Sequence, residues 1–195
     1  MNQDRERLLA AISDLTGRAE ALFRRHTPEE LLRKPALDAW SVAQCIEHLT
    51  TSLRLYLPAF EATLSAGGPR GNGPYRYGPV ARLWIRLIEP GGPKMPAPPK
   101  MRPRGVGKDE GGKAAPVDPS VTLQEFNAAH ARLVDLIRLS DGLDLARIRM
   151  ASPVIPILRF PVGAWFETCI AHGRRHMAQA ERVSAGLASP AGDRG

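Results

Sequence analysis

The sequence contains few cysteines, few aromatic residues and no long apolar run. Two cysteines among 195 residues cannot build the disulfide framework on which many small secreted proteins depend. No segment approaches the roughly 18 consecutive apolar residues of a transmembrane helix. The N-terminal stretch MNQDRERLLAA is charged where a signal peptide would be apolar. These absences predict a cytoplasmic protein that has no membrane partner.

What the chain does contain favours helices. Aromatic residues make up 6% of the chain and hydrophobic residues 43%, and the helix formers Ala, Leu, Arg and Glu are abundant. A chain of this size and apolar content can bury one substantial core. We therefore predict an all-α protein with a single domain over residues 1–187, followed by a frayed tail at 188–195.

The net charge of +7 is concentrated in one segment. Between Arg70 and Lys108 the chain carries nine Lys or Arg residues and one acidic residue, Glu89, so the rest of the chain is close to neutral. A helix that reads nucleic acid would present basic residues at helical spacing, and no such stripe is present. A nucleic-acid partner is therefore not expected.

Apolar residues recur at helical spacing in four long segments. The second of these begins with a Ser41–Gln44 capping box, and a Thr27–Glu30 capping box begins a short helix before it. Pro58 lies inside the second segment, where it can kink the helix or end it early. We expect an extended connector at 152–160, long helices over 3–25, 41–65, 122–139 and 161–185, and short helices at 28–34 and 79–88.

A segment rich in proline and glycine, residues 66–119, separates the second and third long helices. Apart from the short helix at 79–88, its composition cannot supply a packed core. The stretch from Lys94 to Lys108 carries five positive charges and no negative charge. One hypothesis makes it a flexible arm that attracts anionic substrates or an acidic partner. The alternative is a disordered loop that adds solubility.

Two histidines, His172 and His176, lie four positions apart in the last predicted helix. Four residues advance a helix by about 400°, so both imidazoles leave one face about one turn apart. His48 lies beside the apolar stripe of an earlier helix and can supply a third ligand. Three neutral imidazoles suit zinc, nickel or ferrous iron, and a fourth position open to water is typical of a reactive site. The pattern indicates a divalent-metal site.

These histidines lie within two stretches, KPALDAWSVAQCIEHL and AHGRRHMAQAERV, that resemble the DinB superfamily of DinB/YfiT-like metal-dependent proteins. The family pattern is a proline, then Trp-Ser, then a histidine about seven residues after the serine, and a late H-x-x-x-H followed by glutamine. In this chain the pattern falls at Pro35, Trp40-Ser41, His48, His172, His176 and Gln179. The resemblance implies a four-helix bundle whose three histidines bind a divalent metal. It covers most of the chain except residues 66–119, an insert longer and more proline-rich than is usual for the family.

The resemblance also implies a range of functions. Some relatives are thiol-dependent S-transferases or isomerases that use low-molecular-weight thiols, and others form the iron-binding part of a sulfur-transfer enzyme. We therefore predict a metal-dependent enzyme in which the ion activates a thiol or water for transfer to, or hydrolysis of, a small electrophilic substrate. The alternative is a non-catalytic helical module with a structural or vestigial metal site. A third hypothesis is a protein that binds an anionic partner through the insert.

Four further residues have two interpretations each. Cys45 and Cys169 each lie three residues before a predicted ligand, so they either complete a closed Cys/His site or are small buried residues. His130 is either a hydrogen-bonded core residue or a general base beside the metal ligands. Gln179 either orients a ligand or closes the floor of the pocket. No motif identifies the substrate, the native metal or the oligomeric state, and a homodimer through the outer faces of the bundle is a hypothesis only.

Overall fold

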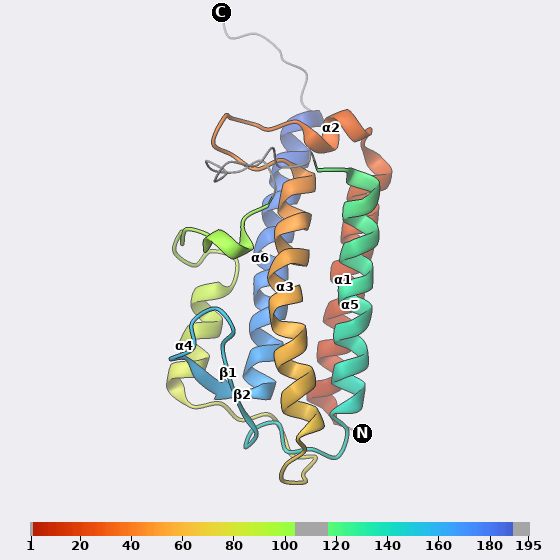
Figure 1. Cartoon of the computed structure of the whole chain (residues 1–195). Coiled ribbons are helices and arrows are strands. Elements are labelled where there is room, and N and C mark those ends of the chain that lie inside the picture. Colours follow the sequence, from red (N-terminus) through yellow and green to blue (C-terminus); the bar gives the residue numbers. More distant parts are fainter. Residues whose placement is uncertain (1, 104–116, 189–195) are drawn as a thin grey trace, which may run out of the picture.

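Four long helices lie side by side and make up most of the molecule (Figure 1). The computed structural model describes residues 2–103 and 117–188 of the chain. Its long helices are α1 (Gln3–Arg25), α3 (Val42–Ser65), α5 (Pro119–Leu139) and α6 (Val162–Ala188). α3 packs against α5 and α6, and α1 packs against the same two helices. The predicted four-helix bundle is confirmed.

Shorter elements complete the fold. They are α2 (Pro28–Leu32), α4 (Pro79–Ile88), the 3-10 helix η1 (Pro99–Met101), and the strands β1 (Arg149–Ala151) and β2 (Arg159–Pro161). The two strands pair antiparallel, with Met150 opposite Phe160. β1 directly precedes the stretch at 152–160 that we expected to be an extended connector, and β2 overlaps the end of that stretch. Two prolines in that stretch prevent a helix, and its extended ends satisfy their backbone groups by pairing.

The directions of the long helices explain why the insert is long. In Figure 1, α1 and α6 run toward the end of the bundle that carries α2, whereas α3 and α5 run away from it. Because α3 and α5 are parallel, the chain between them must travel back along the whole bundle. α3 has 24 residues, and a helix of that length spans about 36 Å at 1.5 Å per residue. The insert is therefore a crossover connection, and its α4 packs against α6.

Two predicted capping boxes form. At the start of α3, the Gln44 N–H donates to Ser41 Oγ at 3.2 Å, and the Ser41 N–H donates to Gln44 Oε1 at 3.1 Å. Thr27 and Glu30 form the same pair of bonds at α2. By contrast, α5 begins three residues before its expected start at residue 122, because the Asp118 side chain accepts from the first free N–H groups. Pro58 does not end α3, which continues to Ser65.

Aromatic side chains fill the interface between α3 and α6. Phe60 and Phe166 stack with ring centroids 4.4 Å apart, and both are fully buried. Tyr56 lies 5.5 Å from the ring of Trp165, whose indole N–H donates to the Met150 carbonyl at 2.8 Å. These contacts hold α3 and α6, the two helices that carry the predicted metal ligands, in a fixed relative position.

The crossover is tied to α6 by one arginine. Arg175 donates to the carbonyl oxygens of Leu87 at 3.1 Å, Gly92 at 3.3 Å and Pro93 at 2.6 Å. The chain turns there through Gly91, whose φ of 88° lies in the left-handed region that glycine adopts without strain. After this turn, η1 packs against α3. The part of the basic stretch from residue 94 to 103 therefore lies against the bundle.

Two predictions concern residues outside the described part of the chain. One is the prediction for the insert, whose residues 104–116 are not described. The other is the prediction for the tail, which is not described from residue 189 onward. Among the described helices, none is long and apolar enough to cross a membrane.

The Phe60–Phe166 stack provides a test of the bundle core. Phe60→Ala should lower the free energy of unfolding by about 3–5 kcal/mol, because it removes a fully buried ring and leaves a cavity. Urea denaturation monitored by circular dichroism measures this change. Leu139→Ala is the matched control: that side chain is 60% exposed, so its loss should cost less than about 0.5 kcal/mol. Equal effects of the two substitutions would contradict the placement of Phe60 in the core.

Candidate metal centre

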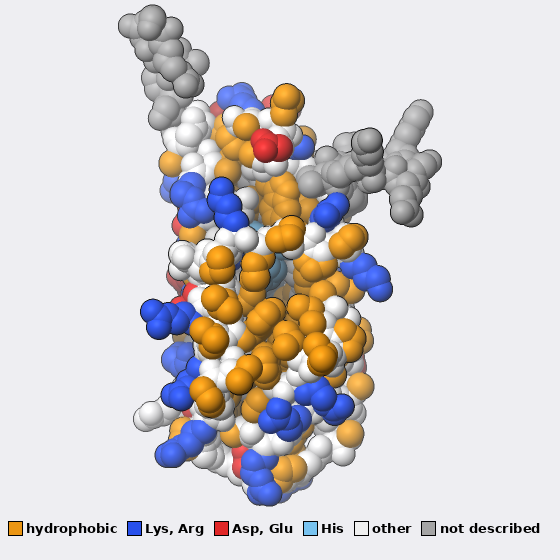
Figure 2. Space-filling model, turned by 90° about the vertical axis from the view of Figure 1, so that its left-hand side faces the viewer, with side chains coloured by type: hydrophobic (Ala, Val, Ile, Leu, Met, Phe, Trp, Pro, Cys, Tyr) orange, Lys and Arg blue, Asp and Glu red, His pale blue; other side chains and the backbone are white. Residues whose placement is uncertain are grey.

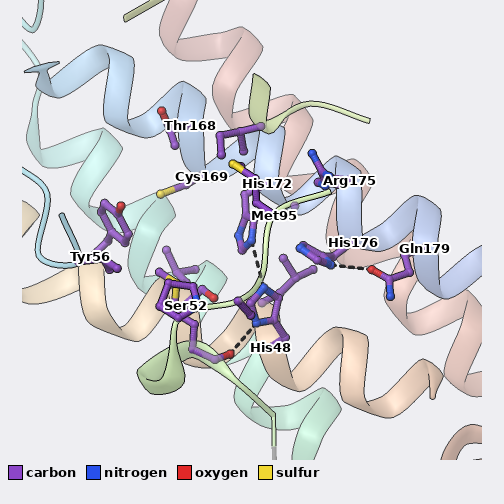
Figure 3. A pocket seen from close by; sticks show the side chains of 18 of the residues that line it. His48, Ser52, Tyr56, Met95, Thr168, Cys169, His172, Arg175, His176 and Gln179 are labelled. Carbon is purple, nitrogen blue, oxygen red and sulfur yellow. Dashed lines mark hydrogen bonds between the residues drawn. The ribbon is translucent and has the colours of Figure 1, made fainter. Parts of the chain in front are cut away.

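Three histidines from two helices meet in the interior of the bundle (Figure 3). His48 comes from α3, and His172 and His176 come from consecutive turns of α6. The Nε2 atoms of His48 and His172 lie 3.1 Å apart, and one nitrogen from each of the three rings lies within 4.8 Å of the others. The structure thus brings together the three residues that the sequence analysis proposed as ligands.

Hydrogen bonds on the far side of two rings determine which nitrogen carries a lone pair. His48 Nδ1 lies 2.5 Å from the Met101 carbonyl oxygen. Because a carbonyl can only accept, His48 Nδ1 carries the hydrogen and Nε2 is left with its lone pair. His176 Nδ1 lies 2.9 Å from Gln179 Oε1, so the same reasoning leaves its Nε2 unprotonated. The free nitrogen of His48 is the one that lies against His172.

Burial keeps these imidazoles neutral. It lowers the pKa of His176 to about 3, with a further contribution from the nearby His48. Burial, followed by the closeness of His176, holds the pKa of His172 well below its usual 6.5. The pKa of His48 is also lowered by burial, although its bond to Met101 acts in the opposite direction. Neutral imidazole is the form that binds metal ions.

The donor set and its spacing fit a divalent ion. Two imidazoles bound tetrahedrally at about 2.1 Å from one ion have nitrogens roughly 3.4 Å apart. The observed 3.1 Å between His48 Nε2 and His172 Nε2 is close to this separation. Outer hydrogen bonds such as those to Met101 and Gln179 are the usual means by which proteins orient imidazole ligands.

A cavity of about 640 Å³ opens beside the three rings. In Figure 2, histidine atoms are visible at the floor of a hollow surrounded by hydrophobic side chains. Trp40 lines this cavity, with its ring centroid 4.7 Å from that of His48 and 5.7 Å from that of His176. A ligand that enters the cavity therefore reaches the histidines directly.

The other predicted residues lie close by but outside the histidine cluster. His130 on α5 lines the cavity, and its Nδ1 donates to the Phe126 carbonyl at 2.9 Å, so its Nε2 is unprotonated. Cys45 and Cys169 are free thiols, and among the described residues neither belongs to the group that could hold a metal. Burial raises the pKa of each thiol to about 12. Cys45 is buried and Cys169 is partly buried, and the described residues form no closed Cys/His site.

Sequence reasoning missed two residues that shape this site. Met101 contributes its backbone carbonyl, which has no signature in the sequence. Arg175 holds the crossover close to the cavity through backbone carbonyls, and a helical surface pattern does not distinguish such an arginine from a solvated one. The only feature of the sequence that could have indicated a role for Arg175 is its position directly before the predicted ligand His176.

The fold and the three imidazoles define a class of protein: a four-helix bundle with a histidine cluster that can hold a metal ion in its interior. The chain belongs to the DinB superfamily, whose sequence model matches residues 2–180. Its fold is similar to that of YfiT from Bacillus subtilis, with a TM-score of 0.59 and 16% sequence identity over 94% of this chain and 87% of that one. YfiT is described as "a probable metal-dependent hydrolase with an unusual four-helix bundle topology". No curated protein matches the chain.

Buried neutral histidines should make the metal-free protein less stable in acid. His130 shows the direction of this pH effect, because burial lowers its pKa to about 4 in the folded chain. Below about pH 6.5 the unfolded chain binds a proton at this residue that the folded chain does not, so the free energy of unfolding falls as the pH falls. His130 alone should contribute a loss of about 1.4 kcal/mol per pH unit between about pH 6 and 4.5, and the three histidines of the cluster add to it. Urea denaturation of metal-free protein across this range measures it.

The control is His130→Gln, which keeps a hydrogen-bonding side chain but cannot titrate. In this variant the free energy of unfolding should fall less steeply with falling pH than in the unchanged protein. The difference in slope should correspond to close to one proton, or about 1.4 kcal/mol per pH unit. An identical slope for both proteins would contradict the lowered pKa of His130.

Proposed function

We propose that His48, His172 and His176 hold one divalent metal ion, and that the protein is a metal-dependent enzyme acting on a small electrophilic substrate. The observation that carries this proposal is the convergence of three neutral imidazoles at the floor of an open cavity. Three protein ligands leave at least one coordination position for water or substrate, which is the arrangement of reactive rather than structural sites. The described metal dependence of YfiT supports it.

A divalent ion held there supplies Lewis-acid chemistry, polarising a substrate oxygen and lowering the pKa of a water or thiol so that it attacks near neutral pH. Zinc, nickel and ferrous iron all accept three imidazoles. The protein contributes the position of each ring: Met101 and Gln179 hold His48 and His176 through their Nδ1 hydrogens. Trp40 packs on the same two rings and shields them from bulk solvent.

The nucleophile comes from outside the protein. Cys169 lines the cavity, but burial raises its pKa to about 12, so it is a thiol and not a thiolate near neutral pH. Tyr56 also lines the cavity, and burial raises its pKa to about 12. Water and a low-molecular-weight thiol are the two candidates, which correspond to hydrolysis and to thiol transfer.

His130 has a supporting role in this proposal. Its unprotonated Nε2 belongs to a side chain that lines the cavity, and it can accept a hydrogen bond from a nucleophile or substrate. Its pKa of about 4 makes it a weak base near neutral pH. We therefore assign it to orienting a bound molecule rather than to carrying away a proton.

Metal content tests the site directly. Protein purified without a chelating column and analysed by atomic emission should contain close to one equivalent of zinc, nickel or iron. His172→Ala should lower this to a small fraction, because it removes one of three ligands. His26→Ala is the control, since His26 bonds to Ser184 and Glu30 and lies outside the cluster. Equal metal content in His172→Ala and in the unchanged protein would contradict the proposed ligands.

The same material separates a catalytic ion from a structural one. With cobalt(II) in the site, an open coordination position should change its visible spectrum when a small thiol or azide is added. A spectrum that no added ligand changes, together with a large rise in melting temperature on metal binding, would favour the structural alternative.

Gln179 offers a test that leaves all three ligands in place. Gln179→Leu removes the acceptor that holds His176 Nδ1, so zinc affinity should fall about 10- to 100-fold. Competition with a chromogenic chelator measures this affinity. Gln124→Leu, an exposed position on α5, should leave it unchanged. Unaltered affinity in Gln179→Leu would show that Gln179 only borders the pocket.

A further inference from the structure

Two polar groups in the cavity wall have no hydrogen-bond partner among the described residues. They are the Ser52 hydroxyl and the Trp84 indole N–H, and both atoms are buried. A buried polar group without a partner destabilises the folded chain, so native proteins retain few of them. Two in the wall of one cavity require an explanation.

Neighbouring hydroxyls in the same cavity show that Ser52 is an exception. Tyr56 OH pairs with Ser152 Oγ at 3.1 Å, and Thr168 Oγ donates to the Ala164 carbonyl at 2.8 Å. Ser52 is only 3% exposed and makes neither kind of bond. It follows His48 by four residues on α3, so it lies on the same face about one turn farther along (Figure 3).

The two tryptophans show the same contrast. Trp165 is fully buried, and its indole N–H donates to the Met150 carbonyl. Trp84, on α4, packs with its ring centroid 6.4 Å from that of Phe160, but its N–H has no acceptor. An indole N–H can only donate, so what it lacks is an acceptor.

The rest of the cavity suits an uncharged, apolar molecule. Of the charged residues that line it, Asp38, Lys94 and Arg182 are exposed, and Arg175 is occupied by backbone carbonyls. Among the described lining residues, no buried charge is therefore left unpaired to offset the desolvation of a charged ligand. Apolar side chains gather around the opening in Figure 2, and Met95 and Ile155, which line the cavity, are 46% and 39% exposed.

We propose that this cavity binds an uncharged, largely apolar molecule bearing a hydrogen-bond acceptor, which Ser52 and Trp84 recognise. This assignment of the substrate class rests on the proposed function, because it places the bound molecule beside the histidine cluster. Binding itself requires no metal ion. A site built to donate hydrogen bonds discriminates against a ligand of the same shape without the acceptor, since its donors would then stay unpaired.

Equilibrium dialysis of metal-free protein with two matched probes tests this inference. 2-Acetylnaphthalene carries a carbonyl acceptor, and 2-ethylnaphthalene has nearly the same shape without it. The ketone should bind about five- to tenfold more tightly, as expected for one hydrogen bond. It should also bind more tightly than 2-naphthoate, which carries a charge. In Ser52→Ala/Trp84→Phe the preference for the ketone over the hydrocarbon should fall to near unity.

Thr168→Val is the matched control, because it removes a hydroxyl from the same wall whose hydrogen is already donated to Ala164. It should keep the preference for the ketone. Both single substitutions, Ser52→Ala and Trp84→Phe, should leave the melting temperature unchanged or higher, since each removes an unpaired group. A lowered melting temperature for Ser52→Ala would indicate a structural role and contradict the inference.

Equal affinity for the ketone and the hydrocarbon, or a preference that survives in Ser52→Ala/Trp84→Phe, would overturn the inference, as would tightest binding of 2-naphthoate. His172→Ala distinguishes this outcome from failure of the proposed function. That variant should lose its metal and still prefer the ketone. Metal binding without a ketone preference would refute only the substrate class, and a ketone preference in a protein that never binds metal would refute only the metal-dependent function.

Discussion

The structure depends on holding three neutral imidazole rings together in the interior of the bundle. His48 Nε2 faces His172 Nε2 at 3.1 Å, and its own hydrogen is committed to Met101 on the opposite side of the ring. Without a cation, such a cluster holds polar ring nitrogens together at the cost of their hydration. The interface between α3 and α6, which includes the Phe60–Phe166 stack, supplies the packing that keeps the cluster in place. Proteins retain buried polar groups that lower the stability of the fold mainly at functional sites.

The crossover between α3 and α5 contributes more than a connection. Because those helices are parallel, the chain must return along the bundle, and its described part up to residue 103 lies over the face that carries the cavity. It provides the Met101 carbonyl to His48, the Trp84 ring to the cavity wall, and the partly exposed Met95 near the opening. Arg175 holds it through four backbone carbonyls, those of Leu87, Glu89, Gly92 and Pro93. The segment with the least regular sequence thus builds much of the cavity wall.

Much of this could be predicted from the sequence, since local patterns determine it. The Ser41–Gln44 capping box marks the start of α3, and the spacing of His172 and His176 places both rings on one face of α6. The start of α5 was misplaced by three residues because Asp118, a better cap, lies in a proline-rich segment with no apolar period. The hairpin, the Met101 carbonyl and the Arg175 clamp depend on long-range backbone contacts, which leave no periodic signal. The unpaired Ser52 hydroxyl is visible only once its surroundings are known.

The most direct test of the three-histidine site is X-ray absorption spectroscopy of the zinc-loaded protein. The first shell should contain only nitrogen and oxygen at about 2.0–2.1 Å, and the outer-shell scattering should correspond to three imidazoles. A sulfur atom at about 2.3 Å would mean that Cys169 or Cys45 binds the ion. Either that sulfur or scattering from a single imidazole would contradict the convergence of His48, His172 and His176 on one metal.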